Sequence, residues 1–230
     1  MPSPPLKLLS SMATRELLVE LAAQYQRITA CVVSTEAAGG VEVAKRVQAG
    51  EPVDVVVLSS TAIDKLIAEG RLSTGSRVDL VRSGVAIAVP AGAPRPDVTS
   101  EAAVRRAVLE ARTLSYSTGP SGVYLEKLFE RWGIRGEIKS RIVVAPPGVP
   151  VGSLVAEGKA QLGFQQLSEL KNLAGIEVLG PLPPEIQTIT VFSGGIGTAT
   201  RDADAARALL SFLASPGVAA AKQRHGMEAA

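Results

Sequence analysis

Aromatic residues, cysteine and histidine are scarce in this chain, and each scarcity narrows what the protein can be. Aromatic residues make up 3% of the 230 residues, so valine, isoleucine, leucine and alanine must fill the core of a chain that is 46% hydrophobic. The single cysteine, Cys31, excludes an internal disulfide. It lies in an apolar run, which predicts a buried structural thiol, because a reactive thiolate needs a positive and accessible site.

The single histidine, His225, leaves the usual transition-metal sites and Cys–His catalysis without support, and we expect no metal and no cofactor. It follows Lys222 and Arg224 in the C-terminal segment, a pattern typical of cations at a helix C-terminus. Formal net charge is +2, from 24 basic and 22 acidic residues, without a basic stripe. Binding to nucleic acid, which needs clustered positive charge, is therefore not expected.

Long apolar runs are also missing. The chain has no stretch of 18 or more apolar residues, so we expect no membrane insertion. The proline-rich start, Met1 to Pro5, leads directly into the apolar strand Leu6–Ser10, which does not fit a signal peptide. The sequence therefore predicts a cytoplasmic chain, or a periplasmic one if a leader segment was removed.

Hydrophobic patterning predicts an α/β protein built from two doubly wound sets. Strands are predicted at Leu6–Ser10, Ile28–Ser34 and Val53–Leu58, with helices between them, and Ser60 is expected to cap the third helix. The run at 53–58 is too apolar to alternate, which indicates a parallel sheet covered on both faces.

Further along, strands at 78–81 and 84–89 and a proline-rich connection precede a second α/β set. We predict one lobe at residues 1–83 plus 192–230 and a second at 84–191, with hinge crossings near 82–92 and 181–195. A cleft between two such lobes is the default position for a ligand.

Several stretches together resemble the periplasmic molybdate-binding protein family, in a subgroup that includes aconitate isomerase-like proteins. The stretches are Leu8–Leu17, Val47–Val55, Arg82–Val89, Ser121–Tyr124, Gly163–Gln166 and Gly180–Pro183. The resemblance implies the type II periplasmic-binding-protein fold, with an anion between two lobes held by hydroxyls and backbone N–H groups. It also implies a monomer and, if the chain is secreted, an ABC permease as partner. Gln166 stands where the family has an anion-contacting tyrosine.

Three turns before predicted helices carry the candidate anion donors, because a helix N-terminus offers unpaired N–H groups and partial positive charge. They are Ser10, Ser11 and Met12; Gly39 and Gly40; and Ser117, Thr118, Ser121 and Gly122. For the first turn the alternative is ordinary N-capping by Ser11 or Thr14; for the others it is a flexible or plain capped turn.

Two further side chains complete the candidate ligand set. Arg82, at the predicted lobe crossing, could grip a carboxylate through two parallel hydrogen bonds; alternatively it is solvated or pairs with Asp79. Of Gln165 and Gln166, strand alternation sends one to each face, so one could reach the ligand while the other caps or packs.

The sequence favours a binding protein for a small anion, either an organic polycarboxylate or a molybdate-like oxyanion. The alternative is a cofactor-independent isomerase that shifts an allylic proton on a small polycarboxylate. That reaction needs a base, for which Glu36 and Glu169 are candidates by position, although each could equally be a solvated surface carboxylate. A ligand-sensing regulatory domain is disfavoured, because no helix-turn-helix segment precedes residue 6.

Overall fold

The computed structural model describes residues 4–230 and divides the chain into two compact units. Unit 1 comprises the residues up to Arg82 together with Val191–Ala230, and unit 2 comprises Ser83–Thr190. The sequence-based boundaries fall one residue later at both crossings. The first three residues, which belong to the segment weighed as a signal peptide, lie outside the described part of the chain.

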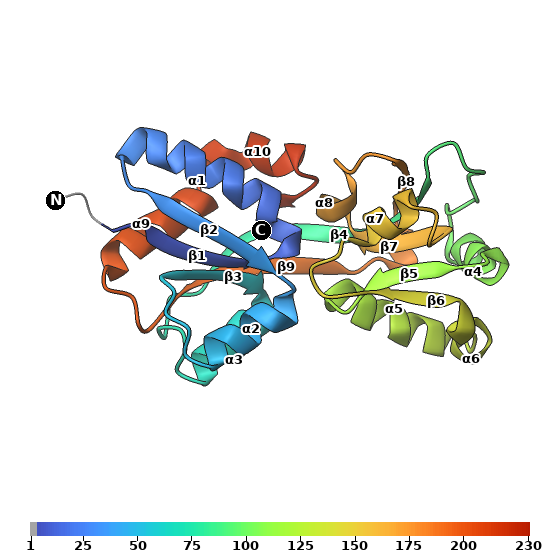
Figure 1. Ribbon diagram of the computed structural model, residues 1–230, viewed down its shortest axis with the longest axis horizontal. Coiled ribbons are helices and arrows are strands. Elements are labelled where there is room, and N and C mark those ends of the chain that lie inside the picture. Colours follow the sequence, from blue (N-terminus) through green and yellow to red (C-terminus); the bar gives the residue numbers. More distant parts are fainter. Residues whose placement is uncertain (1–3) are drawn as a thin grey trace. The chain divides into compact units, whose positions relative to one another are not determined.

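Unit 1 is a sheet between two layers of helices (Figure 1). Its central strand β1 pairs in parallel with β2 and β3, β9 lies antiparallel to β3, and β10 lies antiparallel to the first part of β4. Its elements are β1 (Leu6–Ser11), η1 (Met12–Thr14), α1 (Arg15–Thr29), β2 (Val33–Ala38), α2 (Gly40–Gln48), β3 (Val55–Ser59), α3 (Ser60–Ala68), β4 (Val78–Pro90), β9 (Ile189–Ile196), α9 (Ala203–Ala214), η4 (Pro216–Val218), α10 (Ala219–Arg224) and β10 (Glu228–Ala229).

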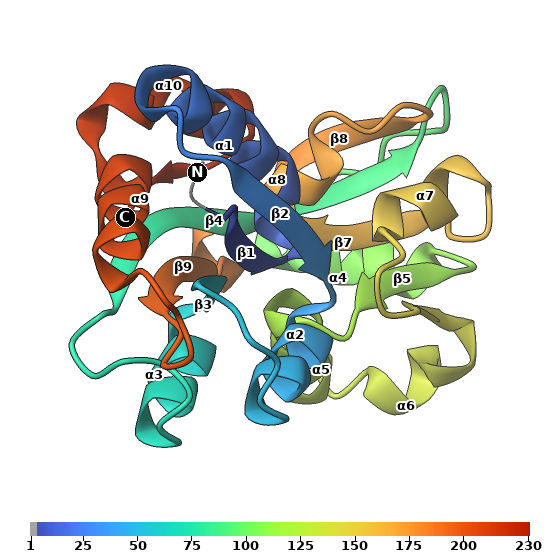
Figure 2. The same cartoon turned by 60° about the vertical axis from the view of Figure 1, so that its left-hand side comes forward.

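The apolar strands of unit 1 are buried on both faces. Leu8, Val55 and Val57 pack into a core with α1, α9 and α10. Their neighbours Leu9 and Val56 pack on the other face, with α2 and α3, which lie side by side in Figure 2. Each fully buried side chain of this kind contributes roughly 1.5–3 kcal/mol. The predicted two-sided parallel sheet is confirmed.

Unit 2 repeats this layering with its own sheet. Parallel strands β6, β5 and β7 lie in that order, β4 runs antiparallel to β7, and β8 runs antiparallel to β4. Besides the rest of β4, its elements are α4 (Glu101–Glu110), β5 (Leu114–Ser117), α5 (Pro120–Arg131), α6 (Arg135–Ile138), η2 (Lys139–Arg141), β6 (Ile142–Ala145), α7 (Val151–Ala156), β7 (Leu162–Gln166), α8 (Leu167–Leu170), β8 (Ile176–Pro181) and η3 (Pro184–Ile186).

The two faces of β4 show how unit 2 is filled. Val85 and Ile87 belong to the core with α4 and α5, whereas Ala86 and Ala88 pack against Leu170 of α8. The strands of this sheet carry small residues where a helix packs closely against them. A Cβ on Gly163 of β7 would lie 2.5 Å from a side-chain carbon of α7. Glycine is therefore needed on this strand to let α7 cover the sheet.

Three sequence-based assignments are wrong. The strand expected at 28–34 starts at Val33, because α1 continues to Thr29 and ends on Ala30 in the left-handed conformation, with φ of 58°. The strands expected at 78–81 and 84–89 are one continuous strand, β4. Ser60 does not cap α3, since Ser59 holds the N-cap position and makes no side-chain capping bond.

Candidate functional site

In unit 1, two of the predicted turns lie against each other at the carboxyl ends of parallel strands. Ser11, the last residue of β1, is opposite Ala38, the last residue of β2. A Cβ added to Gly40 would be 3.7 Å from the Cβ of Ser11. The register of the sheet therefore brings Ser10, Ser11 and Met12 next to Gly39 and Gly40.

The hydroxyl of Ser11 is buried without a hydrogen-bond partner. The residue is 7% exposed, and no group in the described chain bonds its Oγ. The predicted alternative of N-capping is wrong, because neither Ser11 nor Thr14 makes a side-chain cap; the Thr14 hydroxyl instead donates to the carbonyl of Ser11 at 3.2 Å. Gly39 is the N-cap of α2 and has no side chain that could accept hydrogen bonds from the first-turn N–H groups of that helix. The buried Ser11 hydroxyl thus lies beside the N-terminus of a helix whose first-turn amides have no side-chain cap.

In unit 2, the third predicted turn is pressed against the strand that precedes it. The Ser117 Oγ accepts from the N–H of Gly119, the N-cap of α5, at 3.3 Å. A Cβ on Gly122 would lie 1.6 Å from the carbonyl oxygen of Ser117, so only glycine allows this approach. Ser121 is 1% exposed, whereas Thr118 is exposed. The first turn of α5, like that of α2, has no side-chain cap.

Both glutamines at the end of β7 are 2% exposed and form internal hydrogen bonds. Gln165 Oε1 accepts from the N–H of Val151 at 2.8 Å, so this side chain caps α7. In the orientation that satisfies both amide atoms, Gln166 donates to the carbonyls of Ser83 and Gly84 and accepts from the hydroxyl of Thr190 at 2.8 Å. Gln166 thus ties β4 to β9 within unit 2.

Arg82 is engaged by a carboxylate of the chain itself. Its guanidinium pairs with Glu228 at 2.8 Å, and its side chain is 52% exposed. The predicted alternative partner is wrong, because Asp79 pairs with Arg77 at 2.9 Å and accepts from the hydroxyl of Ser193 at 2.6 Å. Arg82 would therefore have to leave Glu228 to bind an external anion.

The two candidate bases differ in their surroundings. Glu36, on β2, pairs with Arg46 at 2.6 Å, and this guanidinium lowers the pKa of Glu36. Glu169, on α8, accepts a hydrogen bond from Gln165 Nε2 at 2.6 Å. Sequence reasoning did not foresee this link, because Gln165 lies on strand β7 and Glu169 on the helix that follows, and no regular spacing predicts a contact across that boundary.

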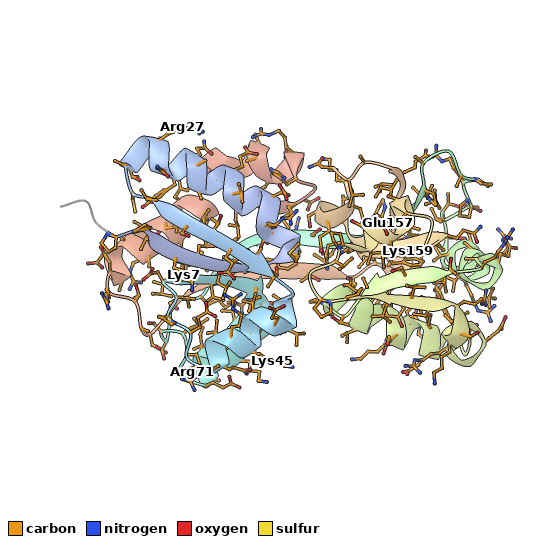
Figure 3. All side chains as sticks on the ribbon, viewed as in Figure 1. Lys7, Arg27, Lys45, Arg71, Glu157 and Lys159 are labelled. Carbon is orange, nitrogen blue, oxygen red and sulfur yellow. The ribbon has the colours of Figure 1, made fainter. Side chains whose placement is uncertain are left out.

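Other features of the described chain lie apart from these turns. Lys7 of β1 (Figure 3) and Arg46 bind Glu51 at the opposite end of unit 1's strands, each at 2.6 Å. Cys31 is half-buried against the core of unit 1, where burial raises the pKa of its thiol. His225, the C-cap of α10, lies 2.8 Å from Glu20.

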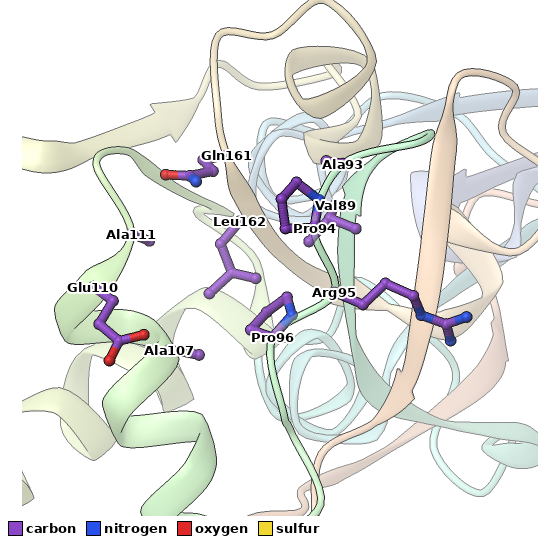
Figure 4. Close-up of a pocket in the computed structure, with 10 residues that line it drawn as sticks. All are labelled: Val89, Ala93, Pro94, Arg95, Pro96, Ala107, Glu110, Ala111, Gln161 and Leu162. Carbon is purple, nitrogen blue, oxygen red and sulfur yellow. The ribbon is translucent and has the colours of Figure 1, made fainter.

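A cavity of about 240 Å³ opens in unit 2 at the amino end of β7 (Figure 4). Its wall includes Leu162, the first residue of that strand, and none of the predicted site residues. Among the residues described, no cluster of three or more histidine, cysteine or acidic side chains could hold a metal ion. Within the same residues, no helix combines the length and apolar character needed to cross a membrane.

Residues 6–228 match the family model described as bacterial extracellular solute-binding protein. Aconitate isomerase from Pseudomonas sp is 38% identical over 231 residues, which cover 97% of this chain and 87% of that protein.

Solved structures share the fold at low sequence identity. The periplasmic molybdate-binding protein of Azotobacter vinelandii superposes with a TM-score of 0.80 and 22% identity, covering 96% of this chain and 98% of that one. The sulfate-binding protein SubI of Mycobacterium tuberculosis H37Rv gives 0.79 and 12%, with coverages of 98% and 86%. The substrate-binding domain of a molybdenum ABC transporter from Clostridium difficile gives 0.74 and 16%, with coverages of 99% and 100%. The predicted periplasmic-binding-protein fold is confirmed.

Proposed function

Because the chain belongs to the family of bacterial extracellular solute-binding proteins, we propose that it binds a small anion at the carboxyl ends of its parallel strands. The observation that carries this proposal is the unpaired, buried hydroxyl of Ser11 beside the uncapped N-terminus of α2. A buried hydroxyl without a partner costs about 1–3 kcal/mol. An anion that accepts from it and from the α2 amides would remove that cost.

The first turn of α5 supplies a second set of donors of the same kind. Its amides are uncapped, and Ser117 and Ser121 add hydroxyls beside them. Neutral donors suit a small anion, because N–H and O–H groups bind oxygen without requiring a buried cation. The organic polycarboxylate and the tetrahedral oxyanion both satisfy this chemistry.

A binding role also suggests a partner and a location. The Clostridium difficile relative is named as part of an ABC transporter, and we extend that partnership, with a membrane permease, to this chain. Such a role places the protein outside the cytoplasmic membrane.

A second candidate function is isomerisation of a small polycarboxylate without a cofactor. The observation that favours it is the identity of 38% to aconitate isomerase over nearly the whole chain. An allylic proton shift requires anion donors together with a carboxylate base, and unit 2 carries both kinds of group at one sheet edge.

A thermal-shift series with molybdate, tungstate, sulfate, citrate and trans-aconitate tests anion binding, with sodium chloride at matched ionic strength as control. A ligand at 100 times its Kd adds about 2.7 kcal/mol of stability. For a chain of this size that raises the Tm by about 5–10 °C. At least one anion should produce such a shift, and S11A should reduce it. A flat response to all five would contradict the proposal.

A further inference from the structure

Two segments of unit 2 start side by side at the carboxyl edge of its sheet. Ser117, the last residue of β5, is opposite Ala145, the last residue of β6, so the turn at 117–122 and the segment 146–150 start about 4.8 Å apart. The first leads to α5 on one face of the sheet, and the second leads to α7 on the other face. Doubly wound sheets bind ligands outside the carboxyl ends of their strands, where such connections part.

The segment 146–150, Pro-Pro-Gly-Val-Pro, forms an exposed apolar turn. The carbonyl of Pro146 accepts from the N–H of Val149 at 3.0 Å, and Gly148 has φ of 79°, which with Pro147 before it fits a type II β-turn. Every residue of the apolar turn but the last is exposed, Val149 at 37%. Because three of its residues are prolines, the turn requires little ordering when a ligand binds.

The backbone of the apolar turn offers few hydrogen-bond donors. Its three prolines have no N–H. The N–H of Val149 is used within the turn, and the N–H of Val151, which follows the turn, donates to Gln165 Oε1 at 2.8 Å. In this stretch the N–H of Gly148 remains. The first turn of α5, by contrast, has amides without a side-chain cap. A ligand at this edge therefore meets donors on one side and an apolar surface on the other.

We propose that the anion bound at this edge is an organic carboxylate, whose charged group binds the α5 turn and whose hydrocarbon part packs on the apolar turn. The inference rests on the proposed function of anion binding and narrows the class of ligand. A tetrahedral oxyanion has oxygen atoms on every side, and those facing the apolar turn would lose water without gaining a donor. A carbon skeleton is stabilised by the same contact. Val149 is then the residue that determines this specificity.

The test compares two anions by calorimetry at matched ionic strength, propane-1,2,3-tricarboxylate and sulfate. The wild type should bind the tricarboxylate about 10-fold or more tightly than sulfate, because two or three carbons are buried. V149T keeps the shape of the side chain and replaces a methyl group with a hydroxyl. It should weaken tricarboxylate binding about 3- to 10-fold and change sulfate binding by less than about 2-fold.

Val32 supplies the matched control. It is 41% exposed, and its carbonyl accepts from the N–H of Leu6 at the amino end of the strands of unit 1. V32T should bind both anions as the wild type does. The heat capacity change of binding gives a second readout, because burial of apolar surface makes it negative. It should be more negative for the tricarboxylate than for sulfate, and V149T should reduce that difference.

The outcomes separate this inference from the proposed function. If neither anion binds, the proposed function itself fails. If sulfate binds as tightly as the tricarboxylate or more tightly, anion binding stands and the organic class of ligand is overturned. If V149T binds the tricarboxylate with the affinity and heat capacity change of the wild type, the role of the apolar turn is overturned.

Discussion

Replacing Ser11 with alanine should change stability and anion affinity in opposite directions. The Ser11 hydroxyl is buried and unpaired, and such a group costs about 1–3 kcal/mol in the unliganded protein. S11A should therefore unfold at an equal or higher denaturant concentration than the wild type. A hydrogen bond to a charged group contributes about 1.5–3 kcal/mol. Anion binding measured by calorimetry should thus weaken about 10- to 150-fold.

Ser76 supplies the matched control within unit 1. It is 4% exposed, and its hydroxyl donates to the Ser73 carbonyl at 2.6 Å and accepts from the Ile196 N–H at 3.0 Å. S76A should lose about 1–3 kcal/mol of stability and keep its anion affinity. If S11A instead lost stability like S76A, or bound the anion as tightly as the wild type, the reasoning about the orphan hydroxyl would be refuted.

Three further perturbations test the architecture around the site. Gly122→Ala puts a methyl group 1.6 Å from a carbonyl oxygen and should cost about 3 kcal/mol or more in chemical denaturation, whereas Gly119→Ala, with 3.4 Å of space, should cost little. Ion pairs, above all with Arg46, lower the pKa of Glu51 from 4.5 to about 2. Above pH 4.5 the wild-type protein should therefore be more stable than E51Q. That difference, about 1 kcal/mol after solvent screening, should vanish as the pH falls from 4.5 towards 2. Burial lowers the pKa of Lys222 below 10.5, so the wild type should gain stability relative to K222M as the pH rises towards 10.5, because the unfolded chain keeps the proton longer.

Much of the fold could be predicted because the patterns were strong. The run at 53–58 left few alternatives to a buried strand, and the segment after the first strand left few alternatives to a helix. The boundary after α1 was missed because its left-handed C-cap is Ala30 instead of glycine, and because Ile28 and Thr29 are β-branched. These residues are exposed, Ile28 at 66%, so the helical backbone hydrogen bonds, including that from the Ala30 N–H to the Gln26 carbonyl, hold them in α1 despite their β-branched side chains.

The candidate site was predictable in position but not in detail. Glycine and serine after apolar strands marked the turns at residues 10–12, 39–40 and 117–122. The partners of buried polar groups depend on contacts between distant segments. Arg82 pairs with Glu228, which is 146 residues away. Gln166 binds backbone carbonyls of β4, and no local pattern contains that information.

The most direct test of anion binding is an amide NMR titration of ¹⁵N-labelled protein with citrate and, separately, sulfate. Amides that donate to an anion shift strongly, and the account predicts the largest saturable changes at Ser11, Gly40 and Val41, and at Ser121 and Gly122. Saturable shifts confined to other parts of the chain, or no saturable shifts with either anion, would contradict it.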